Sequence, residues 1–136
     1  TPRLRGITPA KELKAAGCTV SVASDNTRDP FYAYGDLDMV EVFRETARIA
    51  QIDHPSDDAW DWLRALTALP AASARFAYDG TIAAGRAADL VILRARSWSE
   101  LHSRPQADRI VVRSGRAIDT TLPDYSELDG LIGAPS

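Results

Sequence analysis

The acidic residue Asp25 stands at the position in this sequence that is best suited to chemistry. The segment before it, GCTVSVA over residues 17–23, is apolar and β-branched and predicts a short buried strand. A polar loop, SDNTRDPFY over residues 24–32, follows directly. Enzymes built on parallel strands place catalytic groups and metal ligands at the C-terminal ends of those strands. Asp25 is therefore a candidate metal ligand or proton-transferring carboxylate.

Few residues of the chain are suited to join Asp25 in a metal site. The sequence holds 2 histidines, His54 and His102, and neither lies at a strand end or in a metal-ligand spacing. A catalytic zinc or iron ion usually takes three or more protein ligands. We therefore expect Asp25 to be one part of a larger site, and the isolated chain to bind no metal and to be inactive. The alternative is a loop acid that starts an Asx-turn, with Asn26 and Thr27 as suitable neighbours.

Composition sets limits on the class of protein. The chain has 136 residues, enough for one domain with a core, whereas a (β/α)8 barrel takes roughly 250. With 45% hydrophobic and 26% charged residues, it has the composition of an ordinary globular protein. The net charge of −3 argues against a nucleic-acid or membrane partner, and no apolar run is long enough to span a bilayer. The one cysteine, Cys18, is expected in the core. These features suit a cytoplasmic protein that acts on a small molecule.

Helices are expected on both sides of the predicted strand. Thr8 and Pro9 predict a helix N-terminus with Thr8 as its cap, and Gly17 predicts its end. Leu13 and Ala16 are expected on the inner face of this helix. Because the strand follows without a loop, the unit is typical of parallel α/β folds.

A second helix is predicted to start at Asp38, which forms an acidic variant of the capping box with Glu41. Its apolar positions recur at helical spacing, and they are Met39, Val42, Phe43, Ala47 and Ala50. His54 and Pro55 are expected to break it. A third helix is predicted from residues 56–58 to Pro70, with an inner face made of Trp60, Leu63, Leu66 and Thr67.

From about residue 78 onward the signals are short strands and turns. Strands are predicted at Thr81–Ile82, at 89–93 and at 109–113, and the last pairs with 116–118 through a Ser114-Gly115 turn. Ser97 is expected to cap a helical turn over 97–103. Asp89 is interpreted as capping the preceding turn, and Trp60, Trp62 and Trp98 as packing anchors. The tail from Pro123 is expected to wrap the surface.

Several of these segments together resemble a known family. Residues 24–32 with 34–39 resemble the eighth-strand segment of cytosine deaminase-type amidohydrolases, and 5–9 with Glu12 and Leu13 resemble the run before it. Residues 80–93 are similar to the segment by which metal-dependent amidohydrolases return to their small β-sandwich. Residues 111–116 are similar to its closing hairpin. The resemblance covers nearly the whole chain in the right order.

The resemblance implies an α/β fold and a division of the chain. Residues 1–77 would form the end of a (β/α)8 metallo-dependent hydrolase barrel, with the last strand, the metal-site loop and the flanking helices. Residues 78–136 would be the returning antiparallel strands of a composite β-sandwich, with a tail. Family members take histidine ligands from earlier strands and an aspartate from the last. We therefore expect the chain to be the C-terminal portion of a longer enzyme, an expectation that also rests on its start at Thr1 in mid-pattern.

The resemblance also implies a reaction and a role for three residues. A cytosine-like heterocycle would be deaminated by metal-activated water, with zinc or iron as the divalent ion of the complete enzyme. Asp25 would ligate the metal and relay a proton, and Phe31 would lie near the substrate. Asn26 would also contact the substrate, but it stands where some cytosine deaminases carry a second acid. That departure puts cytosine itself in doubt. Arg28 and Asp29 are expected to pair and stiffen the loop.

Other functions remain open at this point. The chain is alternatively a stand-alone non-catalytic module, such as a truncated paralogue that completes another protein. A cyclic-amide hydrolase of the same superfamily is a further alternative, against which the loop after Asp25 argues. The expected partners are a small heterocycle and the remainder of the same enzyme chain, and a homo-oligomer stays open.

Overall fold

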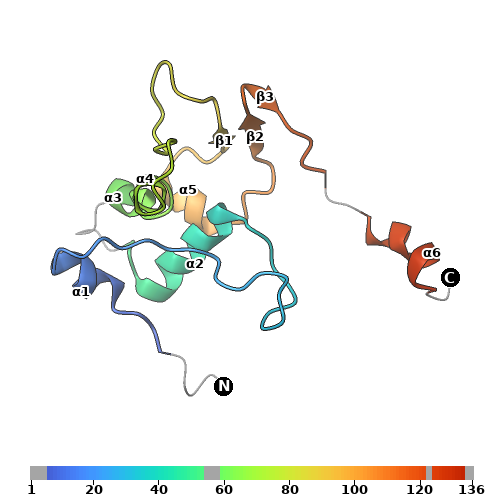
Figure 1. Ribbon diagram of the computed structural model, residues 1–136, viewed down its shortest axis with the longest axis horizontal. Helices are drawn as coiled ribbons and strands as arrows, with labels where there is room; N and C mark the ends of the chain where they lie inside the picture. The colour runs from blue at the N-terminus through green and yellow to red at the C-terminus, as the bar shows by residue number, and fades with distance from the viewer. Residues whose placement is uncertain (1–5, 54–58, 122–123, 134–136) are drawn as a thin grey trace.

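The computed structural model describes residues 6–53, 59–121 and 124–133, and it combines short helices with a small antiparallel sheet (Figure 1). The helices gather around α2 (Met39–Ala50), and the sheet lies beside them. Among the described residues, no helix is long and apolar enough to cross a lipid bilayer. The other elements, in chain order, are α1 (Ala10–Ala15), α3 (Ala59–Arg64), α4 (Ala68–Ser73), β1 (Leu90–Ile92), α5 (Trp98–Ser103), β2 (Ile110–Arg113), β3 (Arg116–Ala117), a 3-10 turn (Tyr125–Leu128) and α6 (Asp129–Ile132).

The end of α1 confirms the prediction, and its start corrects it. Gly17 has φ +86°, and the N–H groups of Gly17 and Cys18 donate to the carbonyls of Lys14 and Leu13 at 2.9 and 3.0 Å. These two hydrogen bonds form a Schellman motif, in which glycine takes the left-handed position. The Thr8 side chain makes no cap, and Pro9 holds the N-cap position instead. A tight turn replaces the cap, because Ala10 N–H donates to the Thr8 carbonyl at 2.7 Å.

The predicted strand over 17–23 is an extended segment without a strand ladder. Strands are defined by backbone hydrogen bonds to a neighbouring strand, and the described residues place none beside this segment. Its Val20 and Val22 side chains pack against the core, and Val22 N–H donates to the Ala65 carbonyl at 3.0 Å. Cys18 is exposed, so its expected place in the core is wrong, as are the inner-face positions expected for Leu13 and Ala16.

Helix α2 starts where the capping pattern predicted. The Asp38 carboxylate accepts the backbone N–H groups of Val40 and Glu41 at 3.0 and 3.4 Å. The same carboxylate is held by the Arg109 guanidinium through two hydrogen bonds of 2.7 and 2.6 Å. The helix therefore begins at a junction between the two halves of the chain.

The core forms around α2, and it uses a different face of α3 from the one predicted. Trp62 and Ala65 are only 2% exposed, whereas Trp60 is 68% exposed. Since α3 ends at Arg64 and a turn follows, the packing of this short helix is set by its neighbours rather than by a long helical stripe. The predicted helix break at 54–55 and restart at 56–58 lie outside the described residues. The other buried apolar residues of this core are Ala10, Phe43, Ala47, Ile52 and Leu101.

Pro70 does not end a helix as predicted. It lies in the first turn of α4, where a proline costs little because the N–H groups of that turn have no intrahelical acceptor.

The sheet confirms the predicted antiparallel hairpin. The strand order is β1-β2-β3, with Val91 opposite Val111 and Arg113 opposite Arg116. Ser114 and Gly115 both have positive φ, at 49° and 76°, as a two-residue hairpin turn requires.

Two details of the second half correct the predictions. The Asp89 carboxylate accepts Ser114 N–H at 2.7 Å, so it caps the hairpin turn rather than the turn before it. Thr81 and Ile82 form no strand among the described residues, and Ile82 is 86% exposed.

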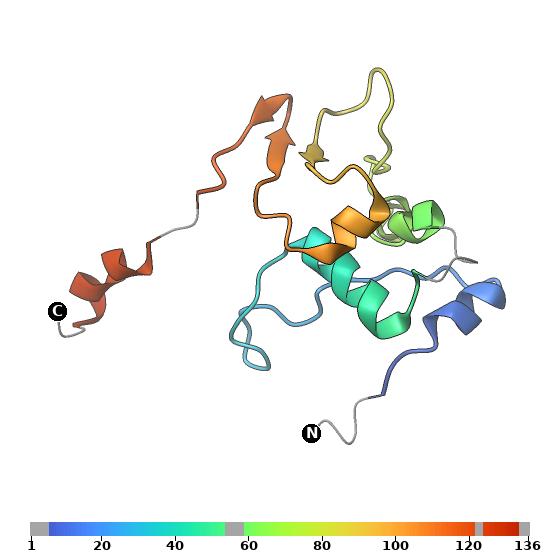
Figure 2. The ribbon, with the colours of Figure 1, turned by 180° about the vertical axis from the view of Figure 1, so that it is seen from behind.

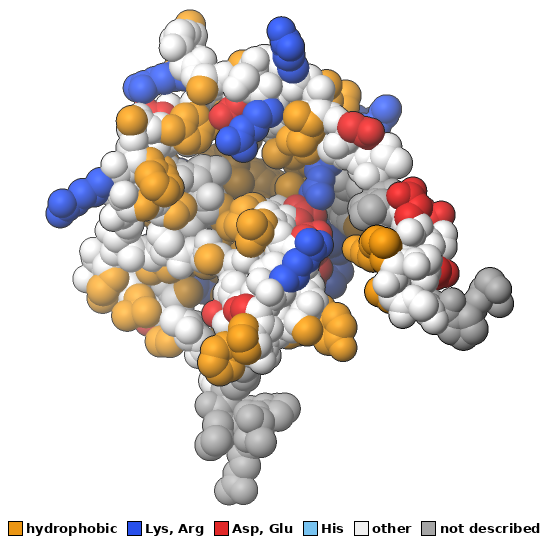
Figure 3. Space-filling view, turned by 45° about the vertical axis from the view of Figure 1, so that its right-hand side comes forward, with side chains coloured by type: hydrophobic (Ala, Val, Ile, Leu, Met, Phe, Trp, Pro, Cys, Tyr) orange, Lys and Arg blue, Asp and Glu red, His pale blue; other side chains and the backbone are white. Residues whose placement is uncertain are grey.

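The C-terminal segment stands away from the rest of the protein. In both ribbon views α6 is separated from the helices and the sheet (Figures 1 and 2), so residues 124–133 do not wrap the surface as expected. Apolar side chains are also exposed elsewhere, and Figure 3 shows many of them on one face around a hollow. A mainly apolar groove of about 630 Å3 lies between α2, α4 and β1. The described residues thus leave much apolar surface in contact with solvent.

The junction at Asp38 yields a stability prediction. Asp38→Ala removes a helix cap and leaves the Arg109 guanidinium without its partner, so we expect a loss of about 2 kcal/mol in the free energy of unfolding. Chemical denaturation of the full-length protein measures it. Glu45→Ala is the control, because Glu45 pairs with Arg48 on the exposed side of α2. A loss no larger than that of the control would contradict the role given to Asp38.

The same junction predicts a pH dependence. Burial acts to raise the pKa of Asp38, but the Arg109 hydrogen bonds and the backbone donors outweigh it and hold the pKa below its ordinary value of 3.8. Since the folded pKa is depressed, the stabilisation is present above pH 3.8 and is lost as the pH falls through the folded pKa. The stability difference between wild type and Asp38→Asn should shrink over that range.

Candidate functional site

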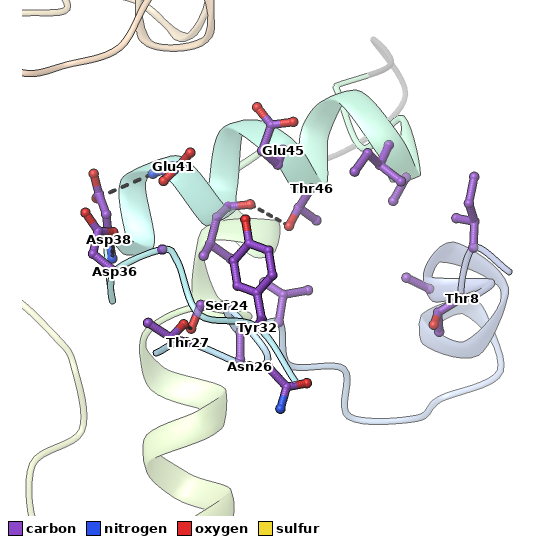
Figure 4. A pocket seen from close by; sticks show the side chains of 18 of the residues that line it. Thr8, Ser24, Asn26, Thr27, Tyr32, Asp36, Asp38, Glu41, Glu45 and Thr46 are labelled. Carbon is purple, nitrogen blue, oxygen red and sulfur yellow. Dashed lines mark hydrogen bonds between the residues drawn. The ribbon is translucent and has the colours of Figure 1, made fainter. Parts of the chain in front are cut away.

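A pocket of about 460 Å3 lies between the segment that contains Asp25 and one face of α2. Its walls come from residues 6–10, from the extended segment at 22–27, from the loop at 32–38 and from α2. Figure 4 shows the Tyr32 ring reaching from the loop toward Thr46 of the helix, while the Glu45 carboxylate points away from the loop. The pocket is open to solvent and large enough for a small heterocycle.

Asp25 lies at the edge of this pocket, in a strained conformation. Its φ of 61° is in the left-handed region, which costs a residue with a side chain roughly 1–3 kcal/mol. Its side chain is exposed, and no described residue donates a hydrogen bond to the carboxylate. Such strain is concentrated at functional sites. The carboxylate is thus available to a ligand, although it does not line the pocket itself.

Asn26 lines the pocket and is anchored from the side by Asp29. The Asn26 amide nitrogen donates to Asp29 Oδ2 at 2.6 Å. The other Asp29 oxygen accepts the backbone N–H groups of Phe31 and Tyr32 at 2.8 and 3.0 Å. The hydrogen bond from Asn26, followed by those of the backbone, lowers the pKa of Asp29. Asp29 is therefore an ionised acceptor at neutral pH.

The predicted pair between Arg28 and Asp29 does not form. Arg28 Nε donates to the Gly35 carbonyl at 3.2 Å, and Arg28 N–H donates to the Tyr34 carbonyl at 3.2 Å. The Asp29 carboxylate instead accepts hydrogen bonds from Asn26 and from the turn that follows it. The two residues stiffen the loop separately, because the turn at Asp29 carries their side chains to different acceptors.

Phe31 and Tyr32 have opposite positions relative to the pocket. Phe31 is 85% exposed and does not line it, whereas Tyr32 does. The Tyr32 ring packs edge-on against the Tyr34 ring, with the ring centroids 5.8 Å apart. Sequence reasoning missed Tyr32. The signal that was available is the Asp29-Pro30 turn, which reverses the chain and brings the residue after Phe31 inward.

An acidic cluster borders the pocket at the start of α2. Carboxylate oxygens of Asp36, Asp38 and Glu41 lie within 4.8 Å of one another. Both Asp38 oxygens are bound by Arg109, and one also caps the helix. The cluster is therefore explained by the helix start and the ion pair.

No histidine joins Asp25 within the described ranges 6–53, 59–121 and 124–133. His102 packs against Phe43 and Trp98, with ring centroids 5.1 and 6.2 Å apart, and burial lowers its pKa. The other histidine, His54, lies outside those ranges. The Asp25 carboxylate has no hydrogen-bond donor among the described residues, so it is suited to act as one ligand of a divalent ion. The remaining ligands of such a site would come from residues outside those described.

The sequence and the fold both match known proteins. Residues 1–119 match the amidohydrolase family. The chain is 59% identical over 134 residues to a pterin deaminase of Rhizobium rhizogenes (strain K84), covering 98% of this chain and 30% of that protein. It therefore spans less than a third of the length of this curated relative.

Among solved structures, the fold is similar to that of 5-methylcytosine deaminase from Klebsiella pneumoniae. Crystal structures of that protein with phosphonocytosine and with 5-fluorocytosine each align with a TM-score of 0.63 at 24% sequence identity. Each alignment covers 88% of this chain and 29% of the other. The shared fold thus extends over most of the described elements.

The packing of Tyr32 against Gly35 yields a further prediction. Gly35 has φ +82°, and a Cβ there would lie 3.2 Å from Tyr32 Cε1. Gly35→Ala should cost about 1 kcal/mol of stability, because alanine is strained at this φ, and should displace the Tyr32 ring. Thermal denaturation and a crystal structure of the full-length variant measure both effects. Gly6→Ala is the matched control, because nothing lies within 4 Å of its added Cβ. An unmoved Tyr32 ring would contradict the packing described here.

Proposed function

The chain belongs to the amidohydrolase family, and we propose that it is the C-terminal part of a metal-dependent deaminase that acts on an amino-substituted nitrogen heterocycle. The observation that carries this proposal is the 59% identity to a pterin deaminase over 98% of the chain. We favour a pterin-type ring over the cytosine-type ring that the family resemblance implies. The likeness to 5-methylcytosine deaminase supports the fold alone.

The proposal assigns an architecture to the chain. Residues 1–77 would close a barrel whose other strands come from the remainder of the enzyme, and residues 78–136 would complete a β-sandwich. The extended segment over 17–23 would then find strand partners on its two sides. The apolar groove between α2, α4 and β1 would be covered by the same remainder. The length of the pterin deaminase, of which this chain matches 30%, supports this reading.

The proposed reaction is hydrolysis of the bond between a ring carbon and its exocyclic amino nitrogen. Water and the amino-substituted ring carbon give a ring carbonyl and ammonia. A divalent ion, when bound, would supply a water molecule of lowered pKa. Asp25 would hold that ion with one carboxylate oxygen, take a proton at its carboxylate and pass it to the departing nitrogen. The open position of the Asp25 side chain, free of hydrogen bonds from the described residues, supports this role.

Asn26 supports a neutral ring as the substrate. An amide offers a hydrogen bond but no negative charge, so it gives less stabilisation to a cationic amidine than a second carboxylate would. A pterin carries its amino group on a ring carbon between two ring nitrogens and is neutral at physiological pH. Phe31 would approach such a ring only if its loop folds inward, whereas Tyr32 already lines the pocket.

A substitution at Asp25 tests the proposed function. In the full-length enzyme, Asp25→Asn should lower metal content and reduce ammonia release from pterin by about a thousandfold or more, because a ligand and a proton relay are lost together. Metal analysis and an ammonia assay measure the two effects. Asp119→Asn is the control, since Asp119 is exposed and bonds only to Thr121 in the described structure. Wild-type metal content and turnover in Asp25→Asn would refute the role.

A further inference from the structure

The orientation of the Asn26 amide is determined by its neighbour. A carboxylate accepts hydrogen bonds and donates none when it is ionised, so only the nitrogen of the Asn26 amide is a suitable partner for Asp29 at 2.6 Å. The low pKa of Asp29, caused first by this bond, agrees with an ionised group. The amide oxygen, Oδ1, must then point elsewhere.

The Asn26 side chain borders the pocket. Asn26 is half-buried and lines the cavity, and Figure 4 shows its oxygen on the side of the pocket where Thr8 lies. Within residues 6–53, 59–121 and 124–133, no group donates a hydrogen bond to Asn26 Oδ1. The pocket thus presents a fixed acceptor that has no protein donor in the described structure.

The position of Asp29 is itself rigid. Its second oxygen holds the N–H groups of Phe31 and Tyr32, and its own N–H donates to the Tyr32 carbonyl at 3.0 Å. A loop locked in this way resists rotation of the carboxylate. The Asn26 amide therefore cannot flip without breaking a short hydrogen bond to a charged group, which is stronger than a bond between neutral groups.

We propose that Asp29 is a positioning residue that fixes Asn26 Oδ1 toward the pocket, so that the site selects heterocycles that donate a ring N–H to it. The inference rests on the proposed function and narrows its substrate class. A ring that carries hydrogen at the nitrogen beside its amino-bearing carbon, as pterin does, satisfies the acceptor. A ring methylated at that nitrogen leaves the Asn26 oxygen without a donor, which costs this hydrogen bond.

The test compares pterin with 3-methylpterin in the full-length enzyme and its Asp29→Asn variant. Asparagine at 29 keeps an oxygen for the backbone N–H groups, but its amide allows Asn26 to flip. We expect the ratio of kcat/KM for pterin to that for 3-methylpterin to fall about tenfold in Asp29→Asn, the equivalent of one hydrogen bond. Arg28→Asn is the control in the same loop, and it should keep the wild-type ratio.

A double-mutant cycle separates positioning from general loop damage. In an Asn26→Ala background, which removes the acceptor, Asp29→Asn should cause no further change in the ratio, because it acts through Asn26. General damage to the loop would lower kcat/KM equally for both substrates. The ratio of the two values would then stay unchanged in Asp29→Asn, and that result overturns the inference. Deamination of pterin by wild type would then show that the proposed function survives. If wild type releases no ammonia from pterin, the proposed function falls and the inference falls with it.

Discussion

The bidentate pair between Asp38 and Arg109 joins parts of the chain that are 71 residues apart. Asp38 ends the pocket loop and caps α2, and Arg109 leads into β2. Both side chains are about four-fifths buried, at 23% and 21% exposure, so the pair is shielded from the solvent that weakens surface ion pairs. This contact fixes the position of α2, which lines the pocket, relative to the antiparallel sheet.

The sequence predicted the features that depend on neighbouring residues. The end of the first helix at Gly17, the Asp38 cap and the Ser114-Gly115 hairpin each need only a few adjacent residues, and each is present. The errors occur where distant residues decide. Packing around Trp62 determines which face of α3 is buried. The strand expected over 17–23 needs adjacent strands, which the described residues do not supply.

The site shows the same division between local and distant causes. The loop after Asp25 was recognised from its residue types, but the turn at Asp29 decided which of its side chains reach the pocket. That turn sends Phe31 outward and Tyr32 inward, and its carboxylate orients Asn26. The backbone of Asp25 is strained, and no described residue donates a hydrogen bond to its carboxylate. Charge and backbone geometry, rather than a large buried core, thus define this pocket.

Asp25 is proposed to be a metal ligand of a deaminase, with the other ligands outside the described residues. The most direct measurement is a crystal structure of the full-length protein, with an anomalous difference map recorded at the absorption edge of its bound metal. We expect a peak about 2.0–2.2 Å from a carboxylate oxygen of Asp25, with histidine nitrogens as the other ligands. A metal peak coordinated without Asp25, or a fully loaded enzyme whose Asp25 faces solvent, would contradict it.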